Sequence, residues 1–329
     1  MRNAKITIND IAEALGISAI SVSRALTGQA GVSEDLRSKI IAKAKEMGYV
    51  KNKNKEDINI LVLHQRPYVQ DNSNFSYKVQ GIEKALQKFG AEYSVEFVER
   101  ENQQKLYLPH KLAKGHNFDG IIYIGRFDDE YVNFLNQKIK NSVFYTGYSP
   151  SFNYDSVWFN FNNGGYKQCE YLICKGHKRI GFLGNTKSFK NREKLLGITS
   201  ALEDYNLSIN EEFFLDIEDA FEERLDRLIY YNERPTAIIC QWDLVAIKLI
   251  KFLYERGISV PKDISVIGSG NSEMSAISIP ALTTLDFHIE YSCEAAVELL
   301  IKRINHPYKP YENITINGTI VERDSVASL

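Results

Sequence analysis

The residues with the clearest potential for chemistry lie in one short stretch, 6–26, with the sequence ITINDIAEALGISAISVSRAL. Thr7 can cap a short helix, and Gly16 suits the sharp turn that would end it. A second helix starting at Ser18 would follow at a steep angle. Its outer face would carry small residues, which let a helix approach base edges closely, and Arg24, which can bind a guanine or a phosphate. This pattern is typical of a helix-turn-helix.

The candidate DNA contacts follow from that second helix. We expect Ala19 and Ile20 to make apolar contacts with thymine methyl groups, and Arg24 to hydrogen-bond to a base. Small helical bundles that bind no DNA show the same apolar stripe and turn, so the motif alone leaves both interpretations open. The full set of candidate DNA-binding residues is Thr7, Ser18, Ala19, Ile20, Ser21, Ser23, Arg24, Thr27 and Asn52.

A third helix and a linker would complete this N-terminal unit. Ser33 can cap the third helix, Leu36 and Ile40 lie on its apolar face, and Gly48 would end it. Residues 51–58 are rich in asparagine and alternating charges, which predicts a linker.

Charge is distributed unevenly along the 329 residues. The first 55 residues hold ten Lys or Arg and five Asp or Glu, so the remaining 274 carry 30 basic against 37 acidic residues. A basic end on an acidic body fits a phosphate-binding unit joined to a body that binds an uncharged ligand, although a solvated tail gives the same count.

Several classes of function lack their motifs. The sequence has no GxSxG elbow, P-loop or GxGxxG fingerprint, so we expect no enzyme and no cofactor. It has no export signal and no membrane-spanning run, so we expect a cytoplasmic protein. The cysteines show no metal-binding spacing and should be buried, reduced thiols: Cys169, Cys174, Cys240 and Cys293. Three histidines are expected to be structural: His64, His177 and His288.

From residue 58 onward, short β-branched or aromatic runs alternate with helical stretches, in two successive series. This alternation predicts an α/β core of two parallel-sheet subdomains with a ligand cleft at their strand ends. Strands are expected at 58–63, 93–98, 119–125, 142–147, 156–161, 179–184, 213–217, 236–241 and 264–270, and helices at 75–90, 103–115, 128–140, 164–175, 190–205, 219–231 and 243–256.

Residues 5–50 closely resemble the headpiece of the LacI/GalR family of transcription regulators, in the runs DIAEALGIS, VSRAL and VSEDLRSKIIAKAKEMGY. The resemblance continues through GHKRI (176–180), DISVIG (263–268) and PALTT (280–284), which look like landmarks of the family's core. That core is similar to periplasmic sugar-binding proteins. The match covers nearly the whole chain.

The resemblance implies a division into domains. The headpiece would be 1–50, the linker 51–58 and the body 59–329. In the family, the chain crosses between subdomains three times, here near 157–162, 285–290 and 314–320. The N-subdomain would therefore hold 59–157 and 288–316, and the C-subdomain 158–287 and 317–329.

The family linker often forms a hinge helix with a leucine wedged into the minor groove. Here Lys51 stands where proline is usual, and Lys55 where a small residue is usual. Lys51, Lys53 and Lys55 could contact phosphates, or the segment could be a plain solvated linker.

The resemblance also implies an effector pocket in the cleft, and Arg192, Phe75 and Asn163 match family pocket positions. On the residues alone, Arg192 could be an ordinary surface arginine, Phe75 a core residue, and Asn163 the cap of a helix beginning at Gly164. The full candidate set is Phe75, Arg126, Tyr148, Phe161, Asn163, Arg192, Trp242, Asn271 and Phe287.

Three of these residues, together with Gly270 beside Asn271, depart from the family. Trp242 stands where asparagine is frequent, Gly270 and Asn271 where two acids are frequent, and Phe287 where polar side chains are common. These departures favour stacking and amide hydrogen bonds over carboxylate contacts with the ligand.

The resemblance implies a repressor of carbohydrate-uptake or catabolic genes. A homodimer would bind a near-palindromic double-stranded operator, under the control of a small sugar-like effector. Two alternatives remain: the same DNA-binding role with a non-sugar metabolite or corepressor, and a sugar-binding receptor without DNA function.

Overall fold

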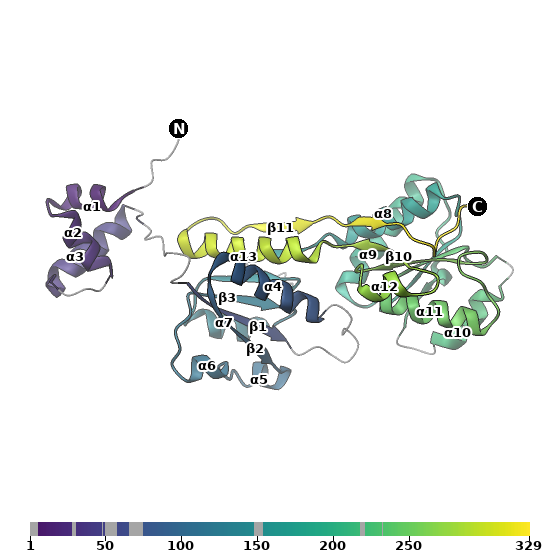
Figure 1. The fold of residues 1–329 in the computed structure, drawn as a ribbon, viewed down its shortest axis with the longest axis horizontal. Coiled ribbons are helices and arrows are strands. Elements are labelled where there is room, and N and C mark those ends of the chain that lie inside the picture. The colour runs from purple at the N-terminus through teal and green to yellow at the C-terminus, as the bar shows by residue number, and fades with distance from the viewer. Residues whose placement is uncertain are drawn as a thin grey trace.

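The computed structural model describes residues 6–27, 31–47, 49, 58–65, 75–147, 154–217, 221–231 and 233–329. Three short helices form a headpiece, and two six-stranded sheets with their covering helices form two lobes (Figure 1). No helix among the described residues is both long and apolar enough to cross a bilayer.

The headpiece consists of α1 (Ile8–Leu15), α2 (Ala19–Thr27) and α3 (Glu34–Glu46). The predicted cap of α1 is confirmed: the Thr7 hydroxyl accepts a hydrogen bond from the Asp10 backbone N–H, and the Asp10 carboxylate accepts one from the Thr7 N–H. The turn at Gly16 is confirmed too, since this residue ends α1 at φ 65°, which favours glycine. The six core residues are Ile11, Ala12, Val22, Ala25, Ile40 and Ala44.

The first lobe is built on a parallel sheet with the strand order β11-β5-β4-β3-β1-β2. Successive residues of β1, which lies between β3 and β2, face opposite sides of the sheet: Ile60 packs toward α4 and α13, and Leu61 toward α7. A strand buried on both faces explains the unbroken apolar run ILVL at 60–63. The elements are β1 (Asn59–Gln65), α4 (Phe75–Phe89), β2 (Glu92–Val98), α5 (Arg100–Gln104), α6 (His110–Ala113), β3 (Gly120–Ile124), α7 (Asp129–Asn136), β4 (Ser142–Tyr145), β5 (Asp155–Phe159), α13 (Ile289–Asn305) and β11 (Asn313–Ile316).

The second lobe has the strand order β12-β10-β9-β8-β6-β7. Its strands are parallel except for β12, which pairs antiparallel to β10. The elements are α8 (Phe161–Cys174), β6 (Ile180–Leu183), α9 (Phe189–Asp204), η3 (Glu211–Phe213), β7 (Phe214–Leu215), α10 (Phe221–Ile229), β8 (Ala237–Cys240), α11 (Asp243–Glu255), β9 (Ser265–Ser269), α12 (Glu273–Ile277), β10 (Thr283–Asp286) and β12 (Thr319–Val321).

The chain passes between the lobes three times. It leaves the first lobe between β5 and α8, returns between β10 and α13, and leaves again between β11 and β12. As a result, α13 and β11 belong to the first lobe although most of that lobe lies far earlier in the sequence (Figure 1).

Three expectations from the sequence are wrong. The single helix predicted for 103–115 is divided into α5 and α6, with Pro109 before α6, because proline cannot continue a helix from the preceding turn. Helix α8 begins at Phe161 rather than Gly164, since the Asn160 side chain caps it by accepting the Asn163 N–H at 3.1 Å. Cys174 is exposed, unlike the other three cysteines.

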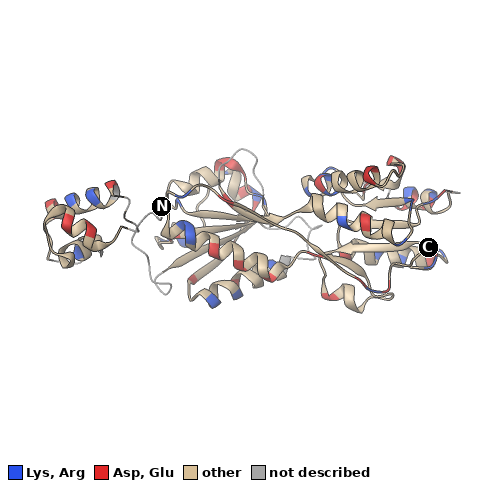
Figure 2. Cartoon of the chain, turned by 90° about the horizontal axis from the view of Figure 1, so that it is seen from above, with Lys and Arg blue, Asp and Glu red and all other residues tan. Residues whose placement is uncertain are grey.

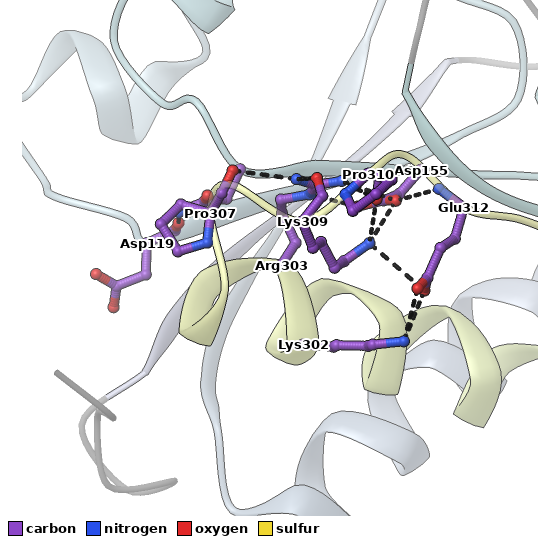
Figure 3. A network of polar contacts seen from close by, with 9 residues as sticks. Asp119, Asp155, Lys302, Arg303, Pro307, Lys309, Pro310 and Glu312 are labelled. Atoms are coloured by element: carbon purple, nitrogen blue, oxygen red, sulfur yellow. Dashed lines mark hydrogen bonds and ion pairs between the residues drawn. The ribbon is translucent and has the colours of Figure 1, made fainter. Parts of the chain in front are cut away.

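A buried ionic network holds one end of the first lobe together (Figure 3). The carboxylate of Asp155 at the start of β5 accepts hydrogen bonds from Arg303 Nε at 2.6 Å, Lys309 Nζ at 2.7 Å and the Glu312 backbone N–H at 2.8 Å. The Arg303 guanidinium also donates to the carbonyl oxygens of Pro307, Lys309 and Pro310. The network thus joins β5, the end of α13 and the loop leading to β11.

This network sets the ionisation of Asp155. Burial acts to raise the pKa of the carboxyl group, but the hydrogen bonds from Arg303, Lys309 and Glu312 outweigh it and hold the pKa below its usual 3.8. Because the pKa is lowered on folding, the ionised carboxylate stabilises the fold above about pH 3.8. That stabilisation is lost as the pH falls through the pKa of the folded state.

We expect Asp155→Asn to lower the free energy of unfolding by about 3–5 kcal/mol at pH 7, because two buried cations lose their counter-charge. The gap between variant and parent should narrow below about pH 3.8, where Asp155 itself takes up a proton. Urea unfolding at several pH values measures both effects. The control is Glu101→Gln, which breaks the exposed Lys105–Glu101 pair and should cost less than about 1 kcal/mol. Equal losses of unfolding free energy in the two variants would contradict the assignment of Asp155 as the counter-charge of two buried cations.

Candidate nucleic-acid interface and interlobe cavity

Helix α2 is fixed at both ends. At its start, the Ser18 hydroxyl accepts the Ser21 backbone N–H at 3.1 Å, which caps the helix. At its end, the Arg37 guanidinium of α3 donates to the carbonyl oxygens of Arg24 at 3.3 Å and Ala25 at 3.0 Å. A cation on the last carbonyls also interacts favourably with the helix dipole. The orientation of α2 in the headpiece is therefore well determined.

The face of α2 that points away from the headpiece core is open to solvent. Ile20 is 65% exposed, whereas Val22 and Ala25 on the other side lie in the core. Ser18 and Arg24 are also exposed, and Ala19, Ser21 and Ser23 are half-buried. A large apolar side chain displayed on a rigid helix among small polar residues is suited to contact with a partner surface.

The remaining candidate DNA contacts lie around this face. The exposed Thr7 uses its hydroxyl in the cap of α1. The Arg24 guanidinium lies so close to Gly31 that a Cβ atom there would be 3.2 Å from it. The side chain of Thr27 and all of Asn52 lie outside the described residues, as do the linker lysines and Gly48.

Three of the predicted pocket residues meet where the lobes join. Phe161 begins α8, Trp242 precedes α11 and Phe287 follows β10. Their ring centroids are 5.4 Å apart for Phe161 and Phe287, 6.2 Å for Trp242 and Phe287, and 6.3 Å for Phe161 and Trp242. Phe287 is only 1% exposed. These rings form an aromatic cluster beneath the crossings rather than an open stacking surface.

The other predicted pocket residues are spread over both lobes. Asn163 has a buried Oδ1 atom that accepts no hydrogen bond from a described residue. Arg126 and Arg192 are exposed and line neither of the two cavities found between the lobes. The side chain of Phe75, the first residue of α4, and all of Tyr148 lie outside the described residues.

Sequence reasoning missed Lys194, a lysine that is buried in the second lobe. Its Nζ atom lies 2.6 Å from Ser269 Oγ and 3.3 Å from the Gln241 carbonyl oxygen, and it is 6.0 Å from the centre of the Trp242 ring. Burial lowers its pKa from 10.5 to about 7, although the nearby Cys240 and Asp243 act in the opposite direction. The helical spacing of Lys194 with buried Ile198 and Ala201 was the available signal.

A cavity of about 560 Å³ opens between the lobes on the side of α4 and α13. Among the described residues of its lining, Asn271 is the one that the sequence predicted as a pocket residue. A second hollow of about 160 Å³ lies near Phe161, where Trp158 of the first lobe stacks on Phe189 of the second with ring centroids 5.8 Å apart. Figure 2 shows acidic and basic residues interspersed over both lobes in that view.

Hydrogen bonds connect the larger cavity to the crossings. Asn271 accepts a hydrogen bond from Arg323 at 2.7 Å and donates one to Asp286 at 3.1 Å. Asp286 also accepts the His288 backbone N–H, and the His288 ring lies 3.1 Å from Thr319 Oγ1 on β12. The second and third crossings are therefore joined directly below the cavity.

Two family models match the chain. The model for bacterial regulatory proteins of the lacI family matches residues 7–52, and the model for the periplasmic binding protein-like domain matches 169–326. The repressor PurR of Photobacterium profundum is 27% identical over 98% of this chain and 99% of its own length. The ribose operon repressor of Haemophilus influenzae is 26% identical with the same coverage.

Solved structures share the whole fold. The CelR–cellobiose complex covers 98% of this chain and 100% of its own, with a TM-score of 0.68 and 20% identity. The lac repressor dimer bound to operator has the same coverage, a TM-score of 0.66 and 23% identity. The headpiece, the two crossed lobes and both family matches lead to one conclusion: this chain belongs to the lacI family of bacterial regulatory proteins and is a DNA-binding transcription regulator.

Proposed function

We propose that this regulator represses carbohydrate-uptake or catabolic genes, and that α2 enters the major groove of its operator. The exposed outer face of α2, on a helix whose inner face is fixed in the core, is the observation that carries the proposal. Ile20 and Ala19 would contact thymine methyl groups, and Arg24 a base edge. Binding to operator DNA requires that the protein act in the cytoplasm.

Regulators of this family bind operators as dimers. We propose that a surface at α12 forms the dimer contact in the second lobe. Met274, Ile277 and Ile279 are 52%, 74% and 92% exposed and lie within six residues of one another. Such a dense group of exposed apolar side chains marks an interaction surface. Because regulators of this family act as dimers, the partner at this surface is a second copy of this chain.

We also propose that a small molecule bound between the lobes controls DNA binding, and that the body catalyses no reaction. The three crossings allow the lobes to move relative to one another, and the cavity beside them has walls on both. The proposed division is a headpiece of 1–50, a linker of 51–58 and a two-lobed body of 59–329. A non-sugar metabolite or corepressor remains the second candidate for the effector, because the aromatic cluster replaces polar side chains that the family commonly has.

We expect Arg24→Ala to weaken specific operator binding by about 1–3 kcal/mol, because a base-edge hydrogen bond is lost. The duplex probe is obtained by selecting a randomised pool with the unmodified protein, and affinity is measured by fluorescence anisotropy at fixed salt. The matched control is Arg227→Ala, which removes an exposed arginine on α10 of the second lobe and should leave affinity unchanged. Equal affinity of Arg24→Ala and the unmodified protein would rule out the assigned base contact.

We expect Ile277→Asp to dissociate the dimer, because a charge would be buried at the centre of an apolar contact. Sedimentation velocity measures the assembly state directly. The variant should also bind the selected duplex more weakly, since a monomer carries one headpiece. Tyr230→Asp, at an exposed site directly after the end of α10, is the control and should remain dimeric. If the Ile277→Asp protein is still dimeric, α12 is not part of the dimer interface.

A further inference from the structure

All strands of the first lobe begin at the same end of that lobe, and the headpiece is attached there. The sheet is parallel throughout, so the loops that precede its strands meet at this strand-start end. Ile58 leads directly into β1, and Tyr49, which packs on the headpiece core, is nine positions earlier. An extended chain of nine residues spans at most about 32 Å. A headpiece bound in a groove therefore keeps the strand-start end close to the DNA (Figure 1).

Two neighbouring loops at the strand-start end carry a cluster of basic residues. The loop before β3 contains Lys114 and His116, and the loop before β4 contains Lys138 and Lys140. All four side chains are exposed. Asp119, directly before β3, is the one acid in these two loops. We call the four exposed residues the basic patch.

The lysines of the basic patch are not committed to any acid. None of the three forms an ion pair or hydrogen bond with another residue in the part of the chain that the structure describes. The other cations at this end are neutralised: Lys302 pairs with Glu312, and Arg303 and Lys309 pair with Asp155 (Figure 3). The positive charge of the patch is therefore available to an external anion.

The nearest acids do not cancel this charge. Asp119 is half-buried, and its carboxylate accepts the Asn59 backbone N–H at 3.0 Å. Glu92 is exposed at the start of β2, but β1 lies between β2 and β3. Two strand spacings separate Glu92 from the loop before β3, which is roughly 10 Å.

Hydrogen bonds hold the two loops of the patch beside the start of β1. The Asn59 side-chain amide donates to the Asn117 carbonyl oxygen at 2.8 Å. The Asn141 amide donates to the Asp119 carbonyl oxygen at 2.9 Å, which joins the two loops to each other. The lysines are therefore carried on ordered backbone next to the point where the headpiece is attached.

The other end of the same sheet has the opposite charge. The segments that follow β2 and β3, 99–102 and 125–130, contain five acids and two arginines. Duplex DNA carries about one negative charge per 1.7 Å of its axis. Only the strand-start end of the two is therefore electrostatically complementary to a duplex.

We infer that the basic patch contacts the DNA phosphate backbone while the headpiece occupies the groove. This inference goes beyond the proposed function, in which α2 of the headpiece supplies the DNA contacts. Phosphate contacts carry no base information, so the patch adds affinity without adding sequence preference. Because the lysines lie on the body, a rotation of the first lobe relative to the headpiece changes how many of them reach the duplex.

The first test compares the full-length protein with a triple variant, Lys114→Gln, Lys138→Gln and Lys140→Gln. Fluorescence anisotropy at several salt concentrations uses the duplex selected from the randomised pool, extended by about ten base pairs on each side. We expect about tenfold weaker binding at low salt. The slope of log affinity against log salt should become shallower by about 0.9 for each lost contact, counted over both subunits. The affinity ratio of selected to scrambled duplex should not change.

A second triple variant controls for net charge. Lys178→Gln, Lys248→Gln and Lys262→Gln remove three exposed lysines of the second lobe. This variant should bind with the slope of the unmodified protein, and sedimentation velocity checks that both variants assemble alike. An unchanged slope in the patch variant, or an equal change in both variants, overturns the inference.

Cross-linking tests the contact directly. Lys140→Cys is prepared in a Cys174→Ser background, because Cys174 is exposed, and a photoreactive group is attached to the introduced thiol. We expect it to cross-link to the bound duplex, whereas the same group at Lys248→Cys should not. Cross-linking to the acidic residues of α3 in place of DNA would show that the patch binds the headpiece, and would overturn the inference.

The selection experiment separates this inference from the proposed function. If no duplex is enriched by the unmodified protein, the proposed operator binding itself fails. If a duplex is enriched but the patch variant binds it with an unchanged salt slope, only the contact by the body fails.

Discussion

The threefold passage of the chain between two sheets is the constraint on which the body depends. Because α13 and β11 return to the first lobe before β12 completes the second, neither lobe is built from one continuous segment of the chain. The crossings bring Asp286, His288 and Thr319 together at one place, beneath a cavity with walls on both lobes. At the other end of α13, Asp155 binds Arg303 and fixes that helix to β5 (Figure 3). Helix α13 thus runs as a rigid connection from the crossings to the opposite edge of the first lobe.

The headpiece is a much smaller unit, in which three helices must be held in a fixed arrangement. Six buried side chains form the centre of its core, partly buried apolar residues pack around them, and polar caps add to this packing. Thr7 and Asp10 define the start of α1, and Arg37 holds the end of α2 from α3. With one face and both ends of α2 engaged, the exposed Ile20 is presented at little entropic cost to a partner surface.

Interactions between neighbouring residues made much of the fold predictable from the sequence. The Thr7 cap, the Gly16 turn and the alternating strands depend on neighbouring residues, and the structure confirms them. Which side chain of α9 faces inward depends on packing against strand ends far away in sequence. Arg192 and Lys194 differ by two positions, or roughly 200° around a helix, so Lys194 is buried while Arg192 is exposed. The predictions for α8 and Cys174 were wrong for the same reason, that packing between distant residues is not visible in the sequence. Asn160 rather than Asn163 caps α8, and Cys174 lies outside the core.

The stacking of Trp158 on Phe189 has a spectroscopic consequence. The chain contains two tryptophans, and both lie where the lobes meet: Trp158 on β5 against a ring of the other lobe, and Trp242 within the aromatic cluster. Any rotation of one lobe against the other changes the polarity and quenching around these indoles. Intrinsic emission therefore reports on lobe movement without a label, and replacing either indole by phenylalanine assigns the signal to one side of the junction.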